Sequence, residues 1–268
     1  MKQLFNLAVC LLLSASLFGQ ANPSTAPIPA VVYTYHKVKS DQVAGFLANV
    51  QVRKKIAEVR KAEKTMLAWL LYEVNNNPEY NYVFVSLYSS YEALENGGNT
   101  TSKPAALKVM SLQQYEASTA KLDETFVKRD FTMNTEGFWK EGVNWEHKFA
   151  GVSFLKTTGE GNYRSLYREF WVPVHKARAE AGLCEGVQLT QLIRGDGSMH
   201  HFNAMTVQLY KNYKQTEPNF DGPRITPEMK KAHPNLTEEQ MKAKIAEIDK
   251  SRTLYFREQW KLVDMIKP

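Results

Sequence analysis

The chain has 268 residues, of which 43% are hydrophobic and 23% charged, and a formal net charge of +6 at pH 7. Basic and acidic residues are interleaved along it, so the sequence offers no basic stripe with aromatic partners and predicts no nucleic-acid partner. It has only 2 cysteines, which excludes a disulfide framework and leaves the hydrophobic core to hold the fold.

The N-terminal segment has the pattern of an export signal. Lys2 precedes the almost wholly apolar residues 4–17, and residues 19–21 are typical of a cleavage site. The apolar stretch is shorter than the roughly 20 residues that a membrane-spanning helix needs. We therefore expect residues 1–21 to be a signal peptide, residues 22–30 a proline-rich linker, and the mature protein to be periplasmic or secreted without a membrane span.

The first half of the mature chain, residues 31–145, predicts the element order βαββαβ. A strand rich in β-branched and aromatic residues precedes a helix with apolar residues at 3.6-residue spacing. Two strands then flank a turn rich in asparagine, and a second helix and a last strand follow. The expected ranges are 31–38, 43–57, 66–74, 80–88, 104–125 and a last strand that precedes or includes Phe138-Trp139.

The second half, residues 146–268, repeats this order. Its expected elements are a strand over 151–157, a helix over 163–181, a hairpin of 187–193 and 202–210, a helix from Thr237 and a strand over 254–266. Thr237 and Gln240 have the spacing of a capping box at a helix start. Residues 211–235 are expected to form a surface loop, and Cys184 to be buried as a small apolar side chain.

The two halves align by a nearly constant offset. Residues 31–82 fall on residues 151–202 at an offset of 120, and Trp139-Lys140 falls on Trp260-Lys261 at 121. Such an offset indicates a tandem duplication. We therefore predict an α+β fold of two fused ferredoxin-like repeats whose sheets pack face to face, since each unit has both helices on one side of its sheet.

This order resembles that of the dimeric α/β-barrel superfamily, which includes antibiotic-biosynthesis-monooxygenase-like, EthD-like and NIPSNAP-like domains. The resemblance covers residues 31–266 as topology. Residues 171–178 lie in the last part of the predicted helix that ends before Gly182. They are also similar to a pattern in uncharacterised exported bacterial members. The superfamily implies haem or a small aromatic substrate as the ligand, with His175 as the axial ligand or the acid/base.

One helix stripe is a candidate site. Trp171, His175 and Arg178 lie on one side of the helix over 163–181, at spacings of four and three. The aligned positions of the first half are Gln51, Lys55 and Glu58, so the stripe belongs to one half only. We predict that His175 and Arg178 are catalytic and that His175 reaches the barrel cavity while Lys55 lies in solvent. The alternative is that Trp171 covers the edge of the core and that His175 and Arg178 are ordinary residues at the boundary between core and solvent.

Further lining residues follow from strand alternation. Adjacent side chains of a strand point to opposite faces, so one register turns His201 and Asn203 into the barrel beside Tyr33 and Tyr35. We predict Trp171, His201, Asn203 and Tyr35 as ligand-binding residues, and solvent-facing positions for the histidine and asparagine are the alternative. No histidine or cysteine spacing predicts a metal site.

Three classes of function are compatible with this sequence. A small-ligand-binding protein needs an apolar cavity with a few polar groups. A haem enzyme or a cofactor-light oxygenase or isomerase needs in addition a histidine or arginine with a shifted pKa inside the cavity. A structural or assembly protein would show a filled barrel and an exposed apolar patch. The oligomeric state is left open.

Overall fold

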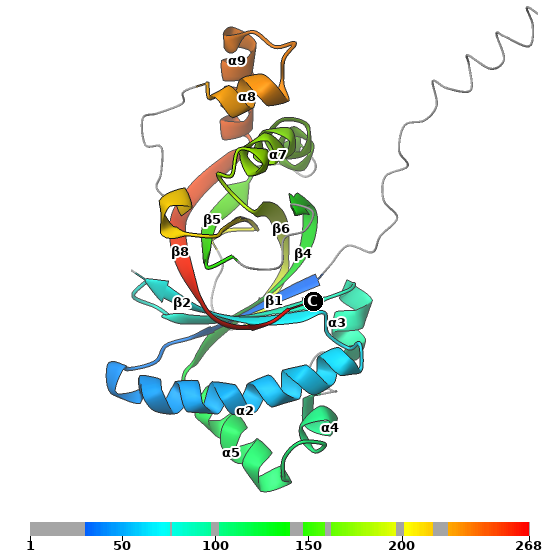
Figure 1. Cartoon of the computed structure of the whole chain (residues 1–268), viewed down its shortest axis with the longest axis vertical. Coiled ribbons are helices and arrows are strands. Elements are labelled where there is room, and N and C mark those ends of the chain that lie inside the picture. Colours follow the sequence, from blue (N-terminus) through cyan, green and yellow to red (C-terminus); the bar gives the residue numbers. More distant parts are fainter. Residues whose placement is uncertain are drawn as a thin grey trace, which may run out of the picture.

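The computed structural model describes residues 30–75, 77–97, 102–139, 147–158, 162–196, 201–216 and 225–267. The predicted signal peptide and the predicted linker up to residue 29 lie outside these residues. Strands and helices are mixed, as predicted, and eight strands form one closed antiparallel barrel with helices on its outside (Figure 1).

The first half contributes four strands and their covering helices. The strands are β1 (Ala30–His36), β2 (Ala68–Asn75), β3 (Tyr82–Tyr88) and β4 (Phe126–Trp139). The helical elements are a 3-10 turn (Ser40–Gln42), α2 (Val43–Ala62), α3 (Tyr91–Gly97), α4 (Ser102–Ala106) and α5 (Leu112–Asp123). The helix predicted over 104–125 is therefore two helices, because Ser111 and Gln114 form a capping box that starts α5 anew.

The second half has the same arrangement of strands. They are β5 (Phe149–Thr157), β6 (Gly186–Asp196), β7 (Ala204–Tyr210) and β8 (Arg252–Ile266). The helical elements are α6 (Asn162–Leu166), a π-helical segment (Tyr167–Trp171), α7 (Val172–Glu180), a 3-10 turn (Tyr213–Thr216), α8 (Pro227–Ala232) and α9 (Glu238–Lys250). The predicted capping box at Thr237 is confirmed. The predicted loop over 211–235 is partly wrong, because it contains the 3-10 turn and α8.

The barrel closes by pairing the edges of the two halves. The strand order is β1-β3-β2-β8-β5-β7-β6-β4, so each half has its own four-stranded sheet, and β2 pairs with β8 while β6 pairs with β4. We expected two sheets that face each other. The structure joins them along both edges into one barrel, which leaves no strand edge unpaired within it.

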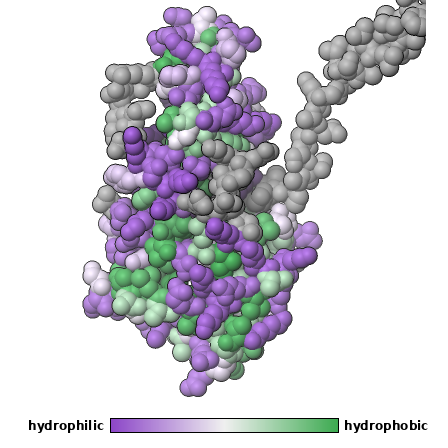
Figure 2. All heavy atoms as spheres, viewed as in Figure 1, coloured by the Kyte–Doolittle hydropathy of each residue, from purple (hydrophilic) through white to green (hydrophobic). Residues whose placement is uncertain are grey.

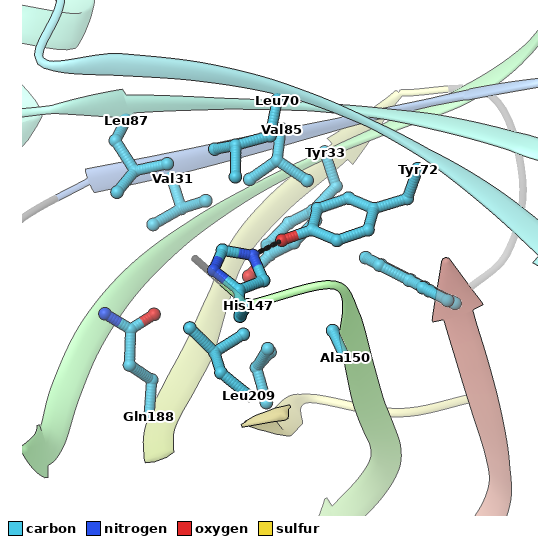
Figure 3. A pocket seen from close by; sticks show the side chains of 12 residues that line it. Val31, Tyr33, Leu70, Tyr72, Val85, Leu87, His147, Ala150, Gln188 and Leu209 are labelled. Carbon is cyan, nitrogen blue, oxygen red and sulfur yellow. Dashed lines mark hydrogen bonds between the residues drawn. The ribbon is translucent and has the colours of Figure 1, made fainter. Parts of the chain in front are cut away.

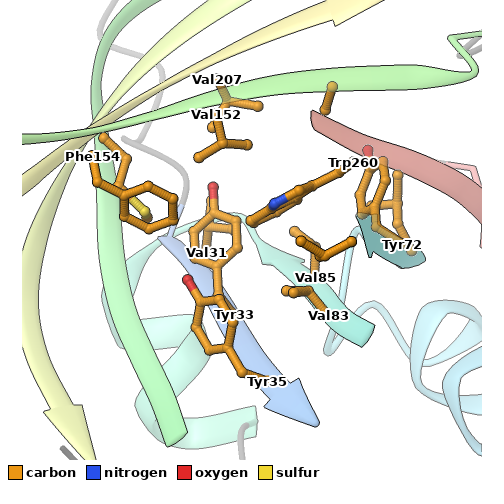
Figure 4. Packing of buried hydrophobic residues seen from close by; sticks show 14 of the residues in the cluster. Val31, Tyr33, Tyr35, Tyr72, Val83, Val85, Val152, Phe154, Val207 and Trp260 are labelled. Carbon is orange, nitrogen blue, oxygen red and sulfur yellow. The ribbon is translucent and has the colours of Figure 1, made fainter. Parts of the chain in front are cut away.

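Strand alternation separates the interior of the barrel from its outer face. Val31, Tyr33 and Tyr35 of β1 point inward, where they pack with Trp260 and Phe154 (Figure 4). The alternate residues Val32 and Phe84 point outward and pack under α2 with Phe46 and Val50, while the equivalent outer cluster of the second half includes Leu155, Phe170 and Val174. The helices of the two halves lie on opposite sides of the barrel (Figure 1).

The predicted offset of 120 agrees with these faces only in part. It relates inward residues of β2 and β6, such as Leu70 and Thr190. In β1 and β5 it fails, because Val31 and Tyr33 point inward in one strand whereas Ala150 and Val152 do so in the other. A one-residue slip inverts the faces of a strand, so the gap-free alignment is wrong in the first strand.

Gly137 tests the seam between β4 and β6. Its φ is +149°, and a Cβ at this position would lie 2.4 Å from the carbonyl oxygen of Val187 on β6. We expect Gly137→Ala to lower the free energy of unfolding by at least about 2 kcal/mol, because backbone atoms cannot yield as a flexible side chain does. Urea unfolding followed by circular dichroism measures this.

The matched control is Gly45→Ala within α2, where a Cβ meets no atom within 4 Å. This change should stabilise the protein by about 0.5–1 kcal/mol through helix propensity. Equal effects of the two substitutions would contradict the close approach at the seam.

Candidate functional site

The interior of the barrel carries polar and ionisable residues. On β4 the inward residues Lys128, Asp130 and Thr132 lie opposite Tyr35, Tyr33 and Val31 of β1, and all six are buried. Between them Phe131 points outward and packs with the helices of the first half. Burial of a lysine and a carboxylate in one interior is expensive unless each has favourable contacts, which makes this interior the candidate site.

A small cavity lies at one end of this interior (Figure 3). Its volume is about 30 Å³, the share of one water molecule in the liquid. Most of its wall is apolar, with Val31, Leu70, Val85, Leu87 and Leu209, and the polar atoms come from Tyr33, Tyr72, His147, Gln188 and Trp260. An apolar wall with a few converging polar groups is typical of a small-molecule site, although this cavity is small for one.

His147 and Tyr72 form the polar centre of the cavity wall. The Tyr72 hydroxyl lies 2.6 Å from Nε2 of His147, and their rings are stacked. Burial lowers the pKa of His147 to about 4, and burial followed by the charge of nearby Tyr33 raises the pKa of Tyr72. At neutral pH both groups are therefore uncharged, and the pair can exchange hydrogen bonds with a hydroxyl or carbonyl group in the cavity.

Lys128 lies toward the other end of the barrel, within a set of aromatic rings. Its Nζ is 4.7 Å from the ring centre of Tyr35, 5.4 Å from that of Tyr80 and 5.5 Å from that of Phe202. Aromatic faces stabilise a desolvated ammonium group by cation–π attraction, on the order of 2 kcal/mol for a favourable contact. These contacts account for a buried lysine in this barrel.

Glu258 of β8 is the second buried carboxylate of the interior. One of its oxygens accepts hydrogen bonds from the Tyr80 hydroxyl at 2.6 Å and from the side-chain amide of Asn77, and the other accepts from Trp260 Nε1 at 2.7 Å. Because Asn77 and Tyr80 belong to the turn between β2 and β3, their hydrogen bonds to Glu258 hold β8 against this turn. The role of Glu258 in this geometry is positional.

The predicted stripe, which begins at the end of the π-helical segment and continues along α7, lies outside the barrel. His175 is 5% exposed, with ring centres of Tyr167 and Trp171 at 6.1 and 6.0 Å. Burial, and to a lesser extent the charge of Arg178, lowers the pKa of His175 to about 3. His175 is not among the residues that line the barrel cavity, so its predicted position is wrong, because α7 packs on the outer face of the sheet. Lys55 is exposed, as predicted.

The other predicted residues are scattered. Tyr35 lies inside the barrel, although it does not line the cavity. His201 is exposed, with its ring centre 6.4 Å from that of Tyr255, and the Oδ1 of Asn203 accepts a hydrogen bond from the backbone N–H of Thr157 at 2.8 Å. Neither lines the cavity.

Arg178 and Trp171 are half-buried on the outer helix layer. The catalytic and binding roles of all six predicted residues stay predictions.

Sequence reasoning named Tyr33 as inward but missed most of the other residues that line the cavity. His147 precedes the strand predicted over 151–157, in a segment where no periodicity marks a side chain as inward. Gln188 and Tyr72 alternate with outward residues along β6 and β2, so the alternation was present in the sequence. Which of the two faces encloses the interior becomes visible only when the strands are paired.

Haem does not fit the described interior. A porphyrin needs a flat slot far larger than the cavity volume of about 30 Å³. His147 is the one histidine among the described residues that line the cavity, and its Nε2 is already hydrogen-bonded to Tyr72. Within the described part of the chain, no group of three or more histidine, cysteine, aspartate and glutamate side chains could hold a metal ion.

No protein-family model matches the sequence, and no curated protein matches it. Among solved structures, an anthrone oxidase-like protein matches with a TM-score of 0.55 and 8% identity over 90% of this chain and 94% of its own. A candidate monooxygenase from Fusobacterium nucleatum matches with a TM-score of 0.56 and 13% identity over 90% and 95%. These likenesses confirm the predicted resemblance at the level of the barrel fold alone.

A haem-binding protein from Thermus thermophilus matches with a TM-score of 0.44 and 7% identity over 91% of this chain and 96% of its own. This likeness is too distant to bear on the cofactor of the present protein. The fit of haem therefore depends on the barrel interior described above.

Three buried histidines predict how stability depends on pH. Burial is the main cause that lowers the pKa of His36 and His175 to about 3 and that of His147 to about 4, against 6.5 in an unfolded chain. Because the folded-state pKa values are the lower ones, the free energy of unfolding is unaffected by these histidines above pH 6.5. It decreases as the pH falls from 6.5 to about 4 for His147 and to about 3 for His36 and His175. Near pH 5 each histidine should cost roughly 2 kcal/mol.

Urea unfolding at pH 7, 6 and 5 measures this loss. His175→Phe should reduce the loss of unfolding free energy between pH 7 and pH 5 by the contribution of one histidine. The phenylalanine ring can remain beside Tyr167 and Trp171 and has no proton to bind. His201→Gln, at an exposed histidine, is the matched control and should keep the wild-type profile. A wild-type profile for His175→Phe would contradict the burial of His175.

Proposed function

We propose that the protein binds a small, partly apolar molecule inside its barrel, with the polar group of the ligand at Tyr72 and His147. The observation that carries the proposal is the cavity in which this uncharged, hydrogen-bonded pair meets a wall of valine and leucine side chains. An apolar wall favours the body of a ligand by burial, and a few fixed polar groups orient it.

The volume of the cavity limits the ligand. At about 30 Å³ the closed barrel accommodates only a few atoms, so an organic ligand must displace interior side chains. Part of its binding free energy is then spent on this rearrangement, and we expect modest affinity. A molecule with one hydroxyl or carbonyl group on a compact apolar body, such as a simple phenol, matches the lining best.

Catalysis is the less supported alternative. A general base works best with a pKa near the operating pH, and the pKa of His147 is about 4. His147 is therefore a weak base at neutral pH, and Tyr72 with its raised pKa stays protonated. The pair is better suited to binding than to proton transfer, and we propose no reaction for it.

An assembly role is the second candidate, and the surface of β8 favours it. Leu254, Tyr255 and Phe256 are consecutive and 39%, 47% and 41% exposed. Leu254 pairs with the outward Leu155, whereas Phe256 pairs with the inward Phe154 and stacks on its ring. The three residues therefore do not form one patch, and they favour an assembly role only together with the nearly filled barrel. A barrel that binds no ligand would leave this role as the better account.

We further propose that the protein is exported after removal of residues 1–21 and arose by tandem duplication of residues 31–145 and 146–268. The sequence pattern of the N-terminal segment supports the first proposal. The common strand order of the two halves supports the second. Among the helices in the described part of the chain, none combines the length and the apolarity needed to cross a membrane.

The ligand proposal is tested by thermal shift of the purified mature protein with phenols, fatty acids, flavin and haem. We expect phenols to raise the melting temperature, and haem to give no absorption band, because a porphyrin does not fit the cavity. Ala150→Val adds two methyl groups to the cavity wall and should abolish the shift. Tyr72→Phe should weaken binding about tenfold, by about 1.4 kcal/mol for the lost hydrogen bond.

Gly45→Ala, on the outer helix α2, is the control and should keep the wild-type response. If no ligand class shifts the melting temperature, or if Ala150→Val responds like the wild type, the barrel site is wrong.

Export is tested by mass spectrometry of the protein recovered from the periplasm or the medium of expressing bacteria. The expected N-terminus is Asn22, because cleavage follows the small residue Ala21. A chain that remains in the cell with Lys2 intact would show that the segment is not a cleaved signal.

A further inference from the structure

A second hollow lies on the outside of the first half, between α2 and the α4–α5 pair. Its volume is about 270 Å³, against about 30 Å³ for the barrel cavity. We call it the α2–α5 groove; the residues that matter below are Val52 and Lys55 of α2, Ala117, Ser118 and Lys121 of α5, and Val109 before α5. These three helices lie together on one side of the barrel (Figure 1).

The walls of the groove are fixed to each other. Asn49 of α2 is buried and donates its side-chain N–H to the backbone carbonyl of Ser118 on α5 at 2.9 Å. One turn further along, Arg53 donates to the Thr119 hydroxyl at 3.3 Å and lies over the ring of Tyr115. These contacts hold α2 against α5, so the position of the two walls of the groove is fixed by the packing of the helix layer.

The charged side chains that line the groove are all positive. Lys55 and Lys121 line it, and no acidic side chain is among its described lining residues. Other lysines of the same region are paired: Lys54 with Asp264, Lys103 with Glu116 and Lys108 with Glu63. In the described part of the chain, no ion pair is formed by Lys55 or Lys121. Two unpaired ammonium groups facing one hollow favour an anion there.

A buried polar group points to a ligand as well. Ser118 is 5% exposed, and its Oγ has no hydrogen-bond partner among the described residues although it is buried. A buried hydroxyl without a partner costs free energy that a partner in the groove would return. Ser118 is one of the residues that line the groove, and its unpartnered hydroxyl is an observation independent of the lysines.

Apolar side chains line the rest of the groove. Val52 and Ala117 belong to its walls, and Val109 is 42% exposed at its edge, next to the exposed Leu107 and Leu112. Figure 2 shows hydrophobic and hydrophilic residues side by side on this part of the molecule. An inorganic anion would use the lysines and leave this apolar area uncovered.

We propose that the α2–α5 groove is a binding site for a small carboxylate with an apolar body, separate from the barrel. Lys55 and Lys121 attract the carboxylate, the Ser118 hydroxyl donates a hydrogen bond to it, and the body covers Val52, Val109 and Ala117. The volume equals roughly nine water molecules at ~30 Å³ each, which suits a ligand of on the order of ten heavy atoms.

The test is isothermal titration calorimetry of the full mature protein with 3-phenylpropionate and with its uncharged analogue 3-phenylpropanol. We expect saturable binding of the carboxylate and about tenfold weaker binding of the alcohol. The double variant Lys55→Gln, Lys121→Gln should lose about tenfold in affinity for the carboxylate, and higher salt should weaken wild-type binding. Ala117→Leu, at an exposed position, should narrow the groove and abolish binding of both probes.

The matched control is Lys103→Gln, Lys108→Gln, which removes two exposed lysines outside the groove and should leave the affinity unchanged. Ala150→Val separates this site from the barrel, because it blocks only the barrel cavity and should leave carboxylate binding intact. Equal affinity for the alcohol, unchanged binding by the Lys55 and Lys121 double variant, or inorganic phosphate binding as tightly as the carboxylate would each overturn the proposal, as would the absence of any binding.

Discussion

Pairing of strand edges between the two halves is the interaction on which the rest of this structure depends. Each half alone is a four-stranded sheet with helices on one face, and it would leave the other face and two strand edges without partners. The pairs Val74 with Trp260 and Thr132 with Leu192 lie in the two seams that close the barrel. Closure satisfies the edge hydrogen bonds and buries both inner faces in one step, so neither half is expected to be stable alone.

Closure also determines the chemistry of the interior. Inward residues of all eight strands share one space that water scarcely enters, so every polar group there needs a partner within the barrel. Lys128 lies against aromatic rings, Glu258 accepts hydrogen bonds from three side chains, and His147 meets Tyr72. The same packing explains the small cavity, because tyrosine and tryptophan side chains fill most of the space that the strands enclose.

The two halves have similar barrel sheets but different outer helix layers. In the second half α7 packs against α8, and His175 is buried beside Tyr167 and Trp171. In the first half the aligned residue Lys55 is exposed and lines a groove between α2 and α5. The outer layers tolerate such differences because the barrel, rather than the helix surface, carries the shared hydrophobic core. The two halves can therefore carry different sites on one scaffold.

The amino-acid sequence by itself determined the eight strands, the main helices, their order and the α+β class, because hydrophobic periodicity, turn residues and the capping box at Thr237 are local properties. It also predicted that Cys184 is buried. It did not predict α3, α8 or the division into α4 and α5. The position of the site depended on tertiary structure. A helical wheel shows that Trp171, His175 and Arg178 share a stripe, but not that this stripe packs on the outer face of a sheet. A strand shows two alternating faces at Tyr72 and Gln188, and only closure of the barrel decides which face is interior. His147 has no periodic neighbours at all, and its place opposite Tyr72 comes from a contact across 75 residues of sequence. Local patterns are set by neighbours in the chain, whereas the cavity is set by pairing between strands that are distant in it.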